Sequence, residues 1–124
     1  MSGRNRFVNK SDPRYAAYLR ILTEELIPAM GCTEPISISF CAAKARELLG
    51  ELPESITVEA SGNIIKNVKS VVVPNTGGRK GIETAAAVGV VAGDPSRELE
   101  VIASVTPEQR EALCRYLEHT PIQI

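Results

Sequence analysis

The chain has 124 residues, of which 44% are hydrophobic and 23% charged, and its 14 basic and 15 acidic side chains leave a formal net charge of -1. A chain of this length buries roughly two-thirds of the surface that its unfolded form exposes, which is enough for one domain with its own core. The balanced charge excludes the strongly basic surface that nucleic-acid binding requires. The apolar content also excludes intrinsic disorder of the whole chain.

The location of the protein is predicted from its apolar segments and its cysteines. No stretch approaches the roughly 20 apolar residues that cross a bilayer. No apolar segment follows the charged start of the chain, as a signal peptide would require. The three cysteines, Cys32, Cys41 and Cys114, form no disulfide framework and suit a reducing compartment. We therefore expect a cytoplasmic protein without membrane or nucleic-acid partners.

The first half of the chain predicts two helices after a polar tail. Residues 1–11 are expected to be disordered, and Asp12 fits an N-cap that is followed by proline at the first helical position. Apolar residues spaced three and four apart then predict a helix over residues 13–28. A second helix is predicted over residues 33–49, with Gly50 as its C-terminal stop.

The second half predicts strands that alternate with helices. Residues 56–60 alternate between apolar and polar, which is typical of a half-buried strand, and residues 64–73 continue as a less regular strand. Thr106, Pro107 and Gln109 match the N-cap, N1 and N3 positions of a capping box. The remaining predicted elements are an alanine-rich helix over 82–92, a strand over 99–105, a helix that ends near His119 and a strand over 121–124.

The predicted element order is ααββαβαβ. This order indicates an α+β fold in which helices cover a small mixed β-sheet. Since no repeat or linker divides the sequence, we expect a single domain over residues 12–124.

Residues 31–35, Gly-Cys-Thr-Glu-Pro, are the most unusual local feature. A cysteine at a helix start faces unpaired backbone N–H groups and the positive end of the helix dipole, which favour the thiolate that attacks or binds metal. The alternative is that Cys32 is a small turn residue and Thr33 caps the helix. Cys41 and Cys114 are instead expected to pack in the core as small hydrophobic residues.

Two further segments combine glycines with polar groups. Residues 61–67, Ser-Gly-Asn-Ile-Ile-Lys-Asn, suit recognition of a small carboxylate, or form a bulge or turn in which Gly62 and Asn63 adopt positive φ. Residues 74–81 precede a helix and either present backbone N–H groups to an anion or form a flexible turn. They lack the spacing of a phosphate-binding P-loop. Because His119 is the only histidine, no catalytic triad is apparent.

Taken together, these segments resemble a known family. Residues 24–36, 61–67 and 73–78, followed by Gly-Ile-Glu-Thr-Ala-Ala-Ala over 81–87, are similar to the N-terminal region of the L-cysteine desulfidase family, which is related to the iron-sulfur L-serine dehydratases. The resemblance implies a lyase that forms pyruvate and ammonia, with sulfide from cysteine, on a 4Fe-4S cluster. It also implies a fold like the small α/β domain of those dehydratases.

The resemblance further implies site residues and partners. Cys32 would be one of three cysteine ligands of the cluster, while the other ligands lie in a C-terminal catalytic portion that this chain lacks. We therefore expect an N-terminal fragment that is inactive alone and holds no cluster by itself. Its partners would be an amino-acid substrate and the missing portion, with a homodimer left open. The alternative is a non-catalytic amino-acid-binding or dimerisation module, which would not need Cys32. The implied substrate-binding residues are Thr33, Glu34, Ser61, Asn63, Lys66 and Asn67.

Overall fold

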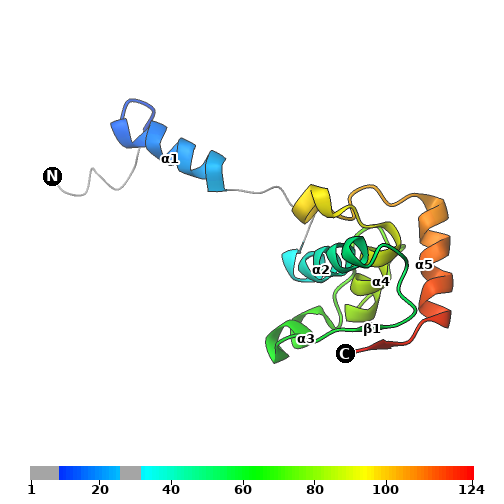
Figure 1. The fold of residues 1–124 in the computed structure, drawn as a ribbon. Helices are drawn as coiled ribbons and strands as arrows, with labels where there is room; N and C mark the ends of the chain where they lie inside the picture. Colours follow the sequence, from blue (N-terminus) through cyan, green and yellow to red (C-terminus); the bar gives the residue numbers. More distant parts are fainter. Residues whose placement is uncertain (1–8, 26–31) are drawn as a thin grey trace.

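The computed structural model of the protein describes residues 9–25 and 32–124 and shows a helical body with a very small sheet (Figure 1). Strands β1 (Ile56–Thr57) and β2 (Ile122–Gln123) pair in parallel, with Ile56 opposite Ile122. The elements are α1 (Pro13–Glu25), α2 (Thr33–Leu49), β1 (Ile56–Thr57), α3 (Gly62–Val68), α4 (Ile82–Ala92), the 3-10 helix η2 (Pro95–Glu100), α5 (Pro107–His119) and β2 (Ile122–Gln123).

The predicted helix ends are confirmed where a capping residue marks them. Helix α2 ends at Gly50, whose φ of 83° is left-handed and whose N–H donates to the carbonyl of Arg46 at 2.8 Å. At the start of α5, Thr106 Oγ1 accepts the N–H of Gln109 at 3.1 Å, while Gln109 Oε1 accepts the N–H of Thr106 at 2.9 Å. This reciprocal pair is the predicted capping box. Helix α1 begins at Pro13 as predicted.

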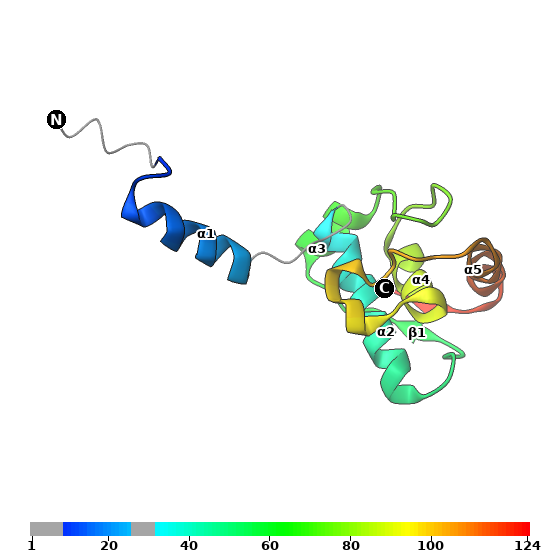
Figure 2. The ribbon, with the colours of Figure 1, turned by 90° about the horizontal axis from the view of Figure 1, so that it is seen from above.

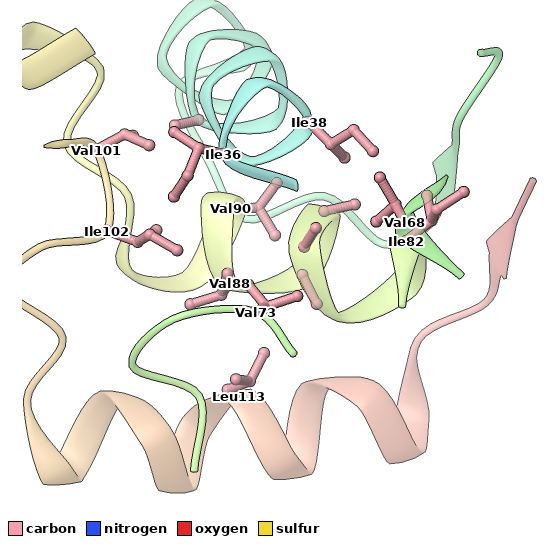
Figure 3. Close-up of a cluster of buried hydrophobic side chains, with 14 of the residues drawn as sticks. Ile36, Ile38, Val68, Val73, Ile82, Val88, Val90, Val101, Ile102 and Leu113 are labelled. Atoms are coloured by element: carbon pink, nitrogen blue, oxygen red, sulfur yellow. The ribbon is translucent and has the colours of Figure 1, made fainter. Parts of the chain in front are cut away.

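Helix α4 forms the centre of the core. Its side chains are buried from Thr84 to Val90, because other elements cover it on several sides. Figure 3 shows Val90 toward Ile36 of α2, and Val88 on the side of Leu113 of α5. These apolar contacts hold α2 and α5 in place around α4.

The contact between α2 and α4 is unusually close because the residues between the two helices are small. A Cβ atom placed on Gly89 would lie 2.3 Å from the carbonyl oxygen of Ser39. The buried hydroxyl of Ser39 donates to the carbonyl of Ala85 at 2.6 Å. This close packing fixes the direction of α2 and therefore the position of its first turn.

Residues 62–68 form helix α3, where the sequence predicted an interrupted strand. Ser61 is the N-cap of α3, and its Oγ accepts the N–H of Ile64 at 3.3 Å. Ile64 and Val68 are one helical turn apart and pack against the core. The strand prediction was wrong because the β-branched residues that favour a strand locally are also able to cover the core from a helix. The alternative of a bulge was wrong too, since Gly62 is the first residue of α3.

Residues 99–105 are the end of η2 and a series of turns, where the sequence predicted a strand. Val101 and Ile102 are both buried, whereas neighbouring residues of a half-buried strand alternate. The side-chain amide of Asn75 donates to the carbonyls of Ile102 and Ala103 at 3.0 and 3.2 Å. A side chain therefore satisfies these carbonyls in place of a neighbouring strand.

The sheet is smaller than predicted. Residues 71–73 contribute a single bridge, between Val72 and Lys80. Of the predicted strands over 56–60 and 121–124, only two residues each are present, as β1 and β2. Among the described residues the sheet has two parallel strands and is not mixed. The broad α+β prediction is loosely consistent with this structure, although helices dominate it.

Helix α1 lies apart from the other elements in both views (Figures 1 and 2). Its apolar side chains are about half exposed, as for Ile21 at 54%. The predicted end of this helix near Pro28 and most of the predicted tail fall outside the described residues, so both predictions stay open, as does that of a single domain. Over residues 9–25 and 32–124, no helix has the length and apolar character needed to span a membrane.

Candidate functional site

The Cys32 segment leads into the first turn of α2. Cys32 is the N-cap residue, with φ -64° and ψ 126°, and its exposed thiol makes no capping hydrogen bond. Thr33 is already inside the helix, so the alternative in which it is the cap was wrong. The carboxylate of Glu34 lies in the first turn, where the positive end of the helix dipole stabilises it. Ile36, two positions after Glu34, is fully buried and packs this turn against the core.

The second polar segment is the outer face of α3. Asn63, Lys66 and Asn67 are exposed and, at spacings of three and four, share one side of the helix. Val68 on the other side is fully buried. The hydroxyl of Ser61 is engaged as the N-cap, so its primary role is to start the helix that presents the other three.

One hydrogen bond joins the two polar segments. Asn67 Nδ2 donates to Glu34 Oε1 at 3.1 Å, across 33 positions of the sequence. Because Asn63 and Lys66 share the outer face of α3 with Asn67, the bond sets this face beside the first turn of α2, where Thr33 is exposed. We call these five residues the polar face. It combines a carboxylate, an ammonium group, two amides and a hydroxyl.

Cys32 does not form a metal centre with other described residues. Within 9–25 and 32–124, no three His, Cys, Asp or Glu side chains gather as metal ligands. Cys41 is nine helical residues further along α2, or about 13 Å at a rise of about 1.5 Å per residue. Cys114 Sγ accepts a hydrogen bond from Arg79 Nη2 at 3.1 Å. The described residues therefore do not fit a cluster that needs three thiolates.

The prediction that the other two cysteines pack in the core was wrong. Cys41 is exposed and Cys114 is half-buried. The reason lies in the close contact between α2 and α4, which turns Ser39 and Ala43 inward and leaves Cys41 on the neighbouring side of the helix. His119 is exposed and lies in the last turn of α5.

Residues 74–81 form a tight turn with internal hydrogen bonds. The buried hydroxyl of Thr76 donates to the carbonyl of Val73 at 2.7 Å. Gly77 and Gly78 are exposed, with φ of 74° and 86°, a conformation that other residues rarely adopt. The turn is thus fixed by its own side chains and glycines, and anion binding at it stays a prediction.

Sequence reasoning missed a groove beside the polar face. Its cavity of about 410 Å³ lies between α2 and residues 56–61, and Ile64 of α3 also lines it. On α2 it is lined by small side chains, including Ser37, Cys41 and Ala45. Their spacing of four residues places them on one side of the helix, and this pattern is the signal that could have revealed the groove.

The chain is similar to proteins named UPF0597. It is 54% identical over 118 residues to a UPF0597 protein of Desulfitobacterium hafniense, a match that covers 95% of this chain and 27% of the relative. It is 56% identical over 107 residues to one of Finegoldia magna, covering 86% of this chain and 26% of the relative. The chain thus spans about a quarter of the length of the curated relatives that it matches. No protein-family model matches it. No solved structure matches it at a significant level.

These relatives correct the family expected from the sequence segments. The chain is also 51% identical over 104 residues to a UPF0597 protein of Treponema denticola, a match that covers 84% of this chain and 24% of the relative. All three relatives therefore carry the same name. None of the three is named a desulfidase or a dehydratase, and their names indicate no iron-sulfur chemistry. The assignment to the L-cysteine desulfidase family was therefore wrong, and the lyase function and iron-sulfur character drawn from it are withdrawn.

Proposed function

We propose that the polar face binds a small molecule that carries both a carboxylate and an amino group, as an amino acid does. The observation that supports this proposal is the 3.1 Å hydrogen bond between Asn67 and Glu34, which sets two separate polar segments side by side. Lys66 and the amide of Asn63 supply a cation and N–H donors for a carboxylate. Glu34 supplies an acceptor for an ammonium group.

The exposure of the polar face fits a part of a larger binding site. Small-molecule sites normally bury most of their ligand, and the side chains of this face are largely open to solvent. In the relatives, about three-quarters of the polypeptide lies outside the matched part. We propose that this remainder closes over the polar face, and that the protein works in the cytoplasm. The present chain alone should bind weakly, with Kd on the order of 1 mM.

The proposal is tested by titrating the 124-residue chain with amino acids and following its backbone amides by NMR. Glycine, alanine, serine and glutamate serve as ligands, while propionate and ethylamine carry only one of the two groups. We expect an amino acid to shift the amides of residues 33–34 and 62–67. The single-group compounds should bind at least about tenfold more weakly, because each leaves one side of the face unpaired.

Two variants and a matched control locate the binding. Lys66→Met removes the cation, and Asn67→Leu removes the bond to Glu34, so each should abolish the shifts. Lys44→Met removes an exposed lysine from the middle of α2, about 16 Å along the helix from Thr33, and should leave the shifts unchanged. If no amino acid shifts these amides, or if the Lys44 variant loses binding equally, the polar face is not a ligand site.

A further inference from the structure

The groove between α2 and residues 56–61 runs along the backbone of β1. Successive residues of an extended chain point to opposite sides, yet all six residues from 56 to 61 line the groove, as is expected where a cavity follows the backbone of a segment. The groove of about 410 Å³ therefore lies along the backbone of β1 and of the four residues that follow it. Ser37, Cys41 and Ala45 of α2 line its opposite side.

The hydrogen bonds of β1 show which of its edges is open. The N–H of Ile56 donates to the carbonyl of Pro121 at 3.0 Å, and the N–H of Val58 donates to the carbonyl of Gln123 at 2.7 Å. Thr57 lies between them and directs its own N–H and C=O away from β2, because these directions alternate along a strand. Among the described residues, β1 has no strand partner on that side.

A parallel pair of two-residue strands is an incomplete sheet. Two strands alone are marginal in water, and parallel sheets occur almost only where further elements bury them. An open edge of this kind is a template for another strand. The side chains of Ser37, Cys41 and Ala45 beside it are small, so they leave room for a backbone to approach α2.

The dimensions of the groove match a short extended segment. The lining residues of α2 extend from Ser37 to Ala45, which is about 12 Å of helix. An extended chain advances about 3.3 Å per residue, so the groove has room for about four residues. Apart from Ser37, Thr57, Glu59 and Ser61, every side chain that lines it is apolar or a thiol.

We infer that this groove receives an apolar strand from the polypeptide that the longer relatives carry outside the matched part. The strand adds to the open edge of β1 through the backbone of Thr57, and its side chains fill the space against α2. The longer relatives carry enough polypeptide to supply this strand, because this chain corresponds to only 27% of the Desulfitobacterium hafniense relative. The mode is β-strand addition, in which main-chain hydrogen bonds give affinity and the groove selects apolar side chains.

The test uses the exposed thiol of Cys41 as a native reporter. The 124-residue chain, with Cys32→Ser and Cys114→Ser, is co-expressed with a tagged polypeptide made of the Desulfitobacterium hafniense protein without its 118 matched residues. We expect the two to co-purify and alkylation of Cys41 by a maleimide to slow at least about tenfold, because the docked strand covers the thiol. In a control variant that retains only Cys32, the maleimide should alkylate this thiol at the same rate with and without the partner polypeptide. Cys32 lies about 13 Å away from Cys41 along α2.

Two pairs of variants test the strand edge and the groove separately. Thr57→Pro removes the outward N–H and should weaken co-purification at least about tenfold, while Thr57→Val keeps the N–H and should bind normally. Ala45→Asp places a charge in the groove, and Lys44→Asp places one at the neighbouring exposed position outside it. Only Ala45→Asp should lose binding. Both variants should fold, because both positions are exposed.

Three results would overturn the inference. One is that the two polypeptides do not co-purify. Another is that they co-purify while Cys41 reacts as fast as in the free chain, which means that binding occurs elsewhere. The third is that Cys41 becomes protected in the chain alone as its concentration rises, which means that a second copy occupies the groove. None of these readouts depends on amino-acid binding at the polar face.

Discussion

Replacement of Gly89 by alanine tests the close contact between α2 and α4. In an open helix this change stabilises a protein by about 0.5–1 kcal/mol, because alanine is the better helix former. At Gly89 the new methyl carbon would lie 2.3 Å from the carbonyl oxygen of Ser39 and 2.9 Å from Ala42 Cβ. Ordinary contacts begin near 3.4 Å, so α2 would have to move away by about 1 Å.

The magnitude follows from what that movement disturbs. Overpacking of a core costs about 1–3 kcal/mol, and here the obstacle is backbone rather than a side chain that can rotate away. Separating the helices also stretches the 2.6 Å hydrogen bond from Ser39 to Ala85, and an unmade buried hydrogen bond costs about 1–3 kcal/mol. After subtracting the gain in helix propensity, we expect Gly89→Ala to lower the free energy of unfolding by about 2 kcal/mol or more.

The assay is urea unfolding followed by circular dichroism, with Gly62→Ala as the matched control. Gly62 is also helical, but a Cβ atom there would meet no atom within 4 Å. We therefore expect Gly62→Ala to be neutral or to stabilise by up to about 1 kcal/mol. A Gly89→Ala variant as stable as the control would mean that α2 and α4 are further apart than in this structure.

Two further predictions concern α5. Thr106→Ala should lower the free energy of unfolding, measured by urea denaturation, by about 1 kcal/mol, because it removes one half of the capping box. Thr106→Ser should keep the capping box and the stability. A serine variant as unstable as the alanine variant would contradict the capping role. Burial raises the pKa of Tyr116 above its usual 10.0, because the folded protein favours the neutral phenol. The stability that this preference contributes is complete below pH 10 and is lost as the pH rises through the raised pKa. Tyr116→Phe should remove this part of the alkaline loss. It should also cost about 1 kcal/mol at neutral pH, because the 2.7 Å bond to the carbonyl of Pro53 disappears. An ultraviolet titration in which every tyrosine ionises at the usual pKa would contradict the burial argument.

Helix boundaries were predictable wherever a short-range signal marked them. Thr33 to Leu49 and the start of α5 after Thr106 were predicted correctly, since capping residues, proline at N1 and a terminal glycine act within one turn. Strands were predicted less well, because the alternation of apolar and polar residues does not reveal whether a partner strand is present. Residues 99–105 illustrate this, since Asn75 takes the place of that partner.

The site was predictable as a set of residue types but not as an arrangement. The sequence drew attention to Glu34 and Asn67 separately, and only the tertiary structure shows the hydrogen bond between them. The exposure of Cys41 could not be predicted, because it depends on which side of α2 faces α4. The metal role of Cys32 came from the resemblance alone, and the resemblance placed the companion ligands outside this chain.

The sequence by itself determined the course of α2, α4 and α5 and the polar residues at the start of α2. These features depend on interactions between residues a few positions apart, and the residues that make them can be read directly from the sequence. Only the tertiary structure decided that residues 62–68 are helical, that β1 has an open edge among the described residues and that a groove lies beside it. Each of these depends on burial against elements distant in the sequence, and the free energy of that burial outweighs local preferences of a fraction of a kcal/mol per residue.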